Sequence, residues 1–162
     1  LIDKYLTPEI RQIYDVVGNS ATVQEVSENL PELKITSLLN GKYIILGGEF
    51  PPVRNPYAMG HCWFVDNFVE APTPDDEIAM LGAVNLKNTA VIGSDFGDVI
   101  KRFPDTTTPS DTISLNYYAP NELRYSFSTS AERAAVFSEI FYPKGWKAWI
   151  EPAGKFGKVQ NE

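Results

Sequence analysis

The spacing of the apolar residues changes along the chain, and this change constrains the fold more than any other feature of the sequence. In the first twenty residues the apolar side chains recur every three or four positions, as on one face of a helix: Ile10, Ile13, Tyr14 and Val17. After residue 111 they recur at every second position, as in half-buried strands: Ile113, Leu115, Tyr117, Leu123, Tyr125 and Phe127. The sequence therefore predicts an α+β protein, with helices first and a C-terminal antiparallel β-meander or half-sandwich.

The N-terminal third contains the signals of three helices. Thr7 is a typical helix cap and Pro8 a typical first helical residue, so we expect the first helix to begin there and to end at Gly18. Apolar residues at helical spacing predict two shorter helices, one before Pro31 and one that ends near Asn40.

The middle of the chain predicts a small mixed α/β part. Three runs rich in β-branched and aromatic residues predict strands: residues 42–46, 62–70 and 88–93. Between the last two, Thr73 and Asp76 form a capping pattern around Pro74, which predicts a helix with Ile78 and Leu81 in its apolar stripe.

A polar stretch at residues 105–111 is the predicted linker, because its Thr, Pro, Ser and Asp residues disfavour both helix and strand. We therefore expect a mixed α/β subdomain at 1–104, the linker at 105–111 and a β-rich subdomain at 112–162. The alternative is one compact unit, which a length of 162 residues also permits.

The net charge of −7 argues against a nucleic-acid partner and against a polybasic membrane patch, since both need excess positive charge. No apolar run approaches the ~18 residues of a membrane span, and the single cysteine, Cys62, cannot form an internal disulfide. The chain opens on Leu1 rather than Met, so we expect an excised piece of a larger protein, with a mature, processed product as the alternative.

Motif matches in the sequence favour structural roles, so we predict no catalytic residue, no metal site and no cofactor. The adjacent pair His61-Cys62 lacks the further His or Cys that zinc needs, and neighbours in an extended segment point to opposite faces. Asp95-Phe96-Gly97 matches a kinase triplet without its companion motifs, which favours a turn or helix start. Asp75-Asp76-Glu77 suits the first turn of a helix, whose dipole favours acidic residues.

Aromatic residues are dense in the C-terminal half, and most are expected in the core because they follow the period of two. On a regular strand, Trp146 lies on the same face as the apolar residues Ala148 and Ile150, and Trp149 on the same face as the charged residues Lys147 and Glu151. This predicts a buried Trp146 and a partly exposed Trp149. Trp149 together with Tyr118 is the candidate glycan contact.

Four segments, in the same order and spacing, resemble segments of the YfhO family of large bacterial membrane proteins. Residues 39–45 (LNGKYII) resemble its LNVKYII, residues 55–65 (NPYAMGHCWFV) its NP-x-ALG-x-AWFV, residues 118–125 (YAPNELRY) its Y-x-x-N-x-L-x-Y, and residues 142–150 (YPKGWKAWI) its YPGW-x-A-x-I.

The resemblance implies a parent protein of the GT-C glycosyltransferase class, which transfers lipid-linked sugars to cell-envelope glycans at the outer face of a bacterial membrane. This chain would be its non-catalytic extracytoplasmic (periplasmic) domain, covering the active site or binding the acceptor glycan. Its partners would be the membrane-embedded remainder of the parent and an envelope glycan. The alternative is a free-standing periplasmic or surface domain that binds carbohydrate or protein.

Overall fold

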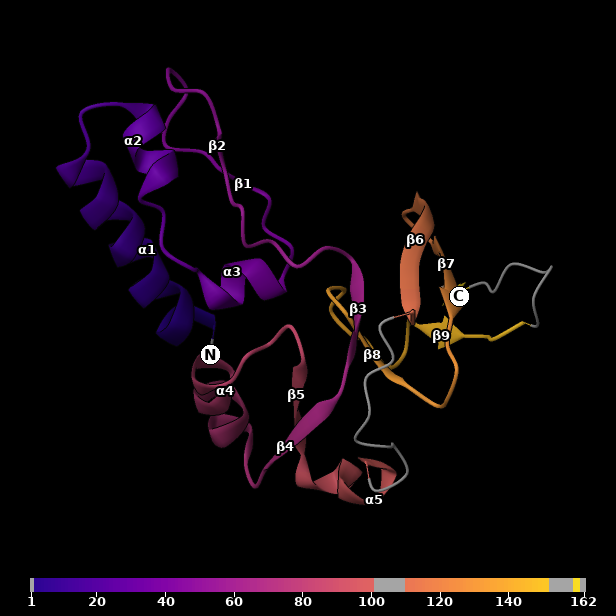
Figure 1. Cartoon of the computed structure of the whole chain (residues 1–162). Helices are drawn as coiled ribbons and strands as arrows, with labels where there is room; N and C mark the ends of the chain where they lie inside the picture. The colour runs from indigo at the N-terminus through magenta and orange to yellow at the C-terminus, as the bar shows by residue number, and fades with distance from the viewer. Residues whose placement is uncertain (1, 101–109, 152–158, 161–162) are drawn as a thin grey trace. The chain divides into compact units, whose positions relative to one another are not determined.

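The computed structural model describes residues 2–100, 110–151 and 159–160 (Figure 1). The chain forms two compact units, Leu1–Gly60 and His61–Glu162. The predicted α+β class is confirmed, with helices first and small antiparallel sheets in the C-terminal part. Within the described residues, no helix is both long and apolar enough to cross a membrane.

The first unit contains three helices and a short antiparallel strand pair. The helices are α1 (Ile2–Asn19), α2 (Val23–Glu28) and α3 (Lys34–Leu38), and the pair is β1 (Tyr43–Ile44) with β2 (Val53–Arg54). Its buried apolar residues come from the helices, their connections and β2: Val26, Leu30, Leu33 and Val53. Asn40 adopts φ 57° just after α3, a left-handed conformation that Asn tolerates and that stops the helix where predicted.

The predicted start of the first helix at Pro8 is wrong, because α1 already runs from Ile2 and contains Pro8. A proline inside a helix removes one backbone hydrogen bond, but its fixed φ is compatible with helical geometry. Pro8 is the seventh residue of α1, so the bond that is lost is the one to the helical carbonyl four residues earlier.

The second unit begins with two strands where the sequence predicts one. β3 (Cys62–Val65) and β4 (Asn67–Ala71) are separated at Asp66, where the backbone N–H groups of Asp66 and Asn67 both donate to the carbonyl of Asn88 at 3.0 Å. Before Asp66 the chain pairs with residues 134–137. After Asp66 it pairs with β5 (Thr89–Gly93), which runs parallel to β4.

Helix α4 (Pro74–Ala83) makes the crossover between the two parallel strands, and Figure 1 shows it beside them. The capping prediction is confirmed, since the Thr73 hydroxyl accepts from the Asp76 N–H at 3.2 Å. Asp95-Phe96-Gly97 spans the junction of the 3₁₀ turn η1 (Ser94–Phe96) and α5 (Gly97–Ile100), the helix-start role predicted for it.

The β-rich part consists of β6 (Thr112–Ala119), β7 (Glu122–Ser128), β8 (Ala134–Phe137), β9 (Lys147–Ala148) and β10 (Val159–Gln160). β6 and β7 form the predicted hairpin, and the four-stranded sheet has the order β6-β7-β10-β9. β8 does not continue this sheet; it pairs antiparallel with β3, Cys62 opposite Phe137 and Val65 opposite Ala134. The predicted linker lies mostly outside the described residues and stays a prediction.

Candidate functional site

A β-bulge in β6 decides which of two neighbouring tyrosines faces the rest of the unit. Leu115 pairs with Tyr125, but Tyr117 then pairs with Arg124 and Tyr118 with Leu123, so the register shifts at Asn116. The Asn116 amide donates to the Ser126 hydroxyl across the bulge. Because the bulge reverses the alternation, Tyr118 and not Tyr117 shares a face with Leu115. The prediction that Tyr117 continues the apolar face of Ile113 and Leu115 is therefore wrong.

His61 precedes β3 and is fixed by its backbone to the end of β8. Its carbonyl accepts a hydrogen bond from the Ser138 N–H at 3.1 Å, which extends the β3–β8 ladder by one residue. The His61 ring centroid lies 5.8 Å from that of Tyr118, with the planes tilted by 51°. His61 Nδ1 lies 3.8 Å from Glu139 Oε1, a charge contact that is too long for a hydrogen bond.

Tyr125 completes this group from β7. Its ring meets the edge of Phe137 at a centroid distance of 4.9 Å. Burial raises the pKa of Tyr125 to about 12, and negative charge on Cys62, Glu139 and Tyr118 adds to the shift. We call His61, Cys62, Tyr118, Tyr125 and Glu139 the His61 cluster.

Two polar atoms of the His61 cluster are buried without a hydrogen-bond partner among the described residues: His61 Nδ1 and the Tyr125 hydroxyl. Buried polar groups in folded proteins are normally satisfied, so these two atoms are exceptions within the described residues. At the surface, the partly exposed side chains of His61 and Glu139 offer polar groups near the ring of Tyr118, which is 62% exposed.

Neither Cys62 nor Tyr125 has the lowered pKa that activates a nucleophile. Burial raises the pKa of the Cys62 thiol, and the pKa of Tyr125 is also raised, so both groups stay protonated at neutral pH. A nucleophile needs the opposite shift. The described residues contain no group of three or more His, Cys, Asp or Glu side chains placed to hold a metal ion.

The raised pKa of Tyr125 predicts an alkaline transition. Because the folded-state value lies above the ordinary 10.0, the neutral hydroxyl stabilises the fold fully below pH 10, and this contribution is lost as pH rises from 10 through 12. The absorbance difference near 295 nm between the wild type and Tyr125→Phe should titrate around pH 12. A difference that titrates near pH 10 would contradict the burial of this hydroxyl.

The two predicted glycan contacts do not lie side by side in the sheet. Tyr118 lies in β6 at one edge, and Trp149 follows β9 at the other edge, which places three strand spacings of ~4.8 Å between them. In the Cα register, Tyr118 lies opposite Leu123, Leu123 opposite Val159, and Val159 opposite Ala148. Trp149 is one residue beyond Ala148, so the alternation of a strand places it on the other face of the sheet from Tyr118. Each aromatic residue is therefore a separate candidate contact, and the prediction that they bind a glycan stays a prediction.

Trp146 is less exposed than Trp149, as predicted, but the cause is not the apolar strand face that the sequence predicts. Trp149 is 45% exposed, whereas Trp146 is half-buried. Trp146 is held by the adjoining turn, since its indole N–H donates to the Ile140 carbonyl at 3.1 Å. The apolar face expected for it is absent, because Ala148 is exposed and Ile150 is 81% exposed.

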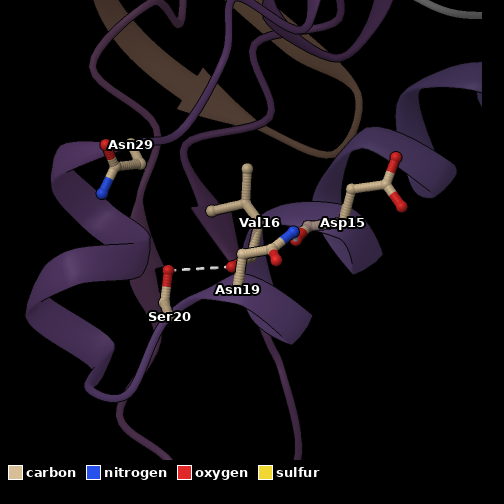
Figure 2. A pocket seen from close by; sticks show the side chains of 5 residues that line it. All are labelled: Asp15, Val16, Asn19, Ser20 and Asn29. Atoms are coloured by element: carbon tan, nitrogen blue, oxygen red, sulfur yellow. Dashed lines mark hydrogen bonds between the residues drawn. The ribbon is translucent and has the colours of Figure 1, made fainter.

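A polar depression at the end of α1 has a structural explanation. It is lined by residues of α1, its C-terminal end and the α2 cap: Asp15, Val16, Asn19, Ser20 and Asn29. Figure 2 shows the Ser20 hydroxyl donating to the Val16 carbonyl, and the distance is 2.8 Å. The Asn19 amide likewise donates to the Asp15 carbonyl at 2.7 Å, so both side chains satisfy carbonyls at the helix end.

Sequence reasoning considered His61 and Cys62 as zinc ligands and as a catalytic pair, and rejected both roles. It missed Tyr125 and Glu139 as site residues. They come together through the β3–β8 pairing and the bulge at Asn116, neither of which has a local sequence signal. The chain matches no model of a protein family, no curated protein and no solved structure.

Proposed function

We propose that this chain is a non-catalytic extracytoplasmic domain of a YfhO-like bacterial membrane protein, and that it binds a cell-envelope glycan at the His61 cluster. The observation that carries the proposal is the exposed ring of Tyr118 beside the His61 imidazole and the Glu139 carboxylate. In this role it assists the transfer of lipid-linked sugars by presenting the acceptor to the membrane-embedded remainder of the protein.

The chemistry of the cluster suits a sugar. An aromatic face stacks against the C–H groups of a pyranose ring, while the carboxylate and imidazole exchange hydrogen bonds with its hydroxyls. Both polar side chains are partly exposed, so a ligand at the surface can reach them. A neutral polar ligand binds there without adding charge to the negatively charged chain.

The resemblance and the cluster also coincide along the sequence. Residues 55–65 contain His61 and Cys62, and residues 118–125 contain Tyr118 and Tyr125. Two of the four segments that resemble the YfhO family therefore supply four of the five residues of the His61 cluster. This supports assigning the glycan contact to the cluster.

The bulge provides a matched pair of variants for testing glycan binding. Tyr117 and Tyr118 are adjacent, both exposed, and on opposite faces of the sheet. We expect the chain to bind cell-envelope oligosaccharides in calorimetric titration and Tyr118→Ala to weaken binding about tenfold, the effect of losing a stacking contact of ~1.4 kcal/mol. Tyr117→Ala should leave binding unchanged. Equal losses in the two variants, or no binding by the wild type, would contradict the proposal.

A further inference from the structure

Strand β5 forms an open edge of its sheet. Among the described residues it pairs only with β4, in parallel, and helix α4 contacts both strands. All five residues of β5 are partly exposed. Parallel sheets are normally covered on both faces and contain more strands, so a parallel pair with an open edge is an incomplete sheet.

The backbone of β5 presents hydrogen-bonding groups at this edge. The Asn67 N–H donates to the Asn88 carbonyl at 3.0 Å, which fixes the hydrogen-bonding register of the parallel ladder. With this register the N–H and C=O of Ala90 turn toward β4, and those of Val91 turn away from it. Val91 therefore offers one donor and one acceptor at the open edge.

β5 lacks the features that protect edge strands from pairing. It contains no charged residue and no proline, and its register with β4 has no bulge. In contrast, the edge strand β6 has the bulge at Asn116, and β4 has the exposed Glu70. An uncharged, regular edge of this kind favours the addition of a further strand.

The two ends of β5 carry opposite charges. Lys87 lies just before the strand and Asp95 just after it, and both side chains are exposed. Asp66, the acid beside the start of β5, is paired with Arg133. The Glu77 carboxylate lies against the last residue of the strand and adds to its acidic end. A strand with a basic start and an acidic end is complementary to an antiparallel copy of itself, whereas parallel copies would bring like charges together.

We propose that the chain forms a two-fold symmetric dimer in which β5 pairs antiparallel with β5 of a second copy. Val91 lies on the two-fold axis, where the two copies exchange N–H to C=O hydrogen bonds. Lys87 is four residues before Val91 and Asp95 four residues after it, so Lys87 of each copy meets Asp95 of the other. This reciprocal match of charges selects a second copy as the added strand.

The net charge of −7 does not prevent this association at physiological salt. The two acidic ends lie at opposite ends of the strand pair, with the Gly93 residues of the two copies about 13 Å apart at ~3.3 Å per residue. This distance exceeds the ~8 Å over which charges interact strongly at this salt, so the charges that meet across the pair decide. The dimer does not depend on glycan binding.

Charge variants test the proposed register, because both positions are exposed. Sedimentation equilibrium of the full chain should show a reversible monomer–dimer equilibrium. Lys87→Asp and Asp95→Lys should each weaken the dimer at least about fivefold, because each replaces two opposite-charge pairs by two like-charge pairs. A mixture of the two variants should associate like the wild type, since opposite charges then meet at both ends. Lys144→Asp makes the same charge change outside β5 and should alter association less than about twofold.

Amide hydrogen exchange locates the interface within the dimer. Raising the protein concentration should slow exchange at Val91, whose N–H enters the dimer, and change exchange at Ala90 much less, because that N–H already turns toward β4. The proposal is overturned if the wild type stays monomeric up to about 0.5 mM. It is also overturned if the mixture associates no better than either variant alone, or if exchange at Val91 does not depend on concentration. The Tyr118→Ala variant should dimerise normally, so a failure of glycan binding leaves this test intact.

Discussion

Replacing Arg133 by methionine should lower the free energy of unfolding by about 3–5 kcal/mol, because it leaves the buried carboxylate of Asp111 and the partly buried carboxylate of Asp66 without their cation. The Arg133 guanidinium forms an ion pair with Asp66, and its Nε lies 3.4 Å from Asp111 Oδ2. The side chains of Arg133 and Asp111 are only 5% and 3% exposed. Asp111 also accepts from the N–H of Ser130 at 3.1 Å, so this ion-pair group fixes the entry to both β6 and β8.

Tryptophan fluorescence during urea unfolding measures this effect, since all three tryptophans lie in the second unit. Arg124→Met is the matched control: Arg124 pairs with Glu122 on a more exposed surface and should cost much less. Adding Asp66→Asn to Arg133→Met should recover stability, with a coupling energy of at least about 1 kcal/mol. Equal losses for the two arginine variants would show that the Arg133 ion pairs do not stabilise the fold.

Sequence reasoning succeeded where the structure depends on neighbouring residues. The cap at Thr73 and the turn between β6 and β7 are local, because their hydrogen bonds join residues that are close in sequence. The change from helical to strand spacing gave the fold class for the same reason, since the period of the apolar residues reflects local backbone geometry. The helix start failed at Pro8 because proline favours the first helical turn and disfavours the interior, whereas α1 begins at Ile2 and runs through this proline.

The remaining features depend on contacts between distant residues. Nothing near β8 shows that it pairs with β3 rather than with β7, because the apolar run Ala134–Phe137 indicates a strand without specifying its partner. The bulge at Asn116 reverses the alternation after Leu115, and the sequence there still fits a regular strand. The His61 cluster depends on both features, which is why Glu139 and Tyr125 carry no signal of a shared site.

The first unit contains a similar long-range contact that the sequence does not reveal. Helix α3 has Leu33 at its N-cap, and this residue provides no side-chain hydrogen bond. The buried Glu9 carboxylate of α1 takes this role: Oε1 accepts from the Ile35 N–H at 2.7 Å, and Oε2 accepts from the Thr36 N–H at 3.0 Å and its hydroxyl at 2.6 Å. A charged acceptor at a helix N-terminus also interacts favourably with the helix dipole.

Glu9→Ala should therefore destabilise the first unit by about 2–4 kcal/mol, because three donors on α3 lose a charged acceptor and become unsatisfied. The first unit contains no tryptophan, so the measurement is far-UV circular dichroism during unfolding, with amide hydrogen exchange at Ile35 and Thr36. Both amides should exchange faster in the variant.

Glu32→Ala is the control for this prediction. It removes the same charge just before α3, but from an exposed side chain, and should cost less than about 0.5 kcal/mol. Glu9→Gln should fall between the two, because the amide keeps one acceptor oxygen and turns an NH₂ group toward Thr36. If Glu9→Ala and Glu32→Ala lower stability by the same amount, the effect is one of net charge, and the capping of α3 by Glu9 does not stabilise the fold. If the Ile35 amide exchanges faster in Glu9→Ala but not in Glu32→Ala, the loss of stability lies at the N-terminus of α3. There the Glu9 carboxylate replaces the cap that Leu33 does not provide.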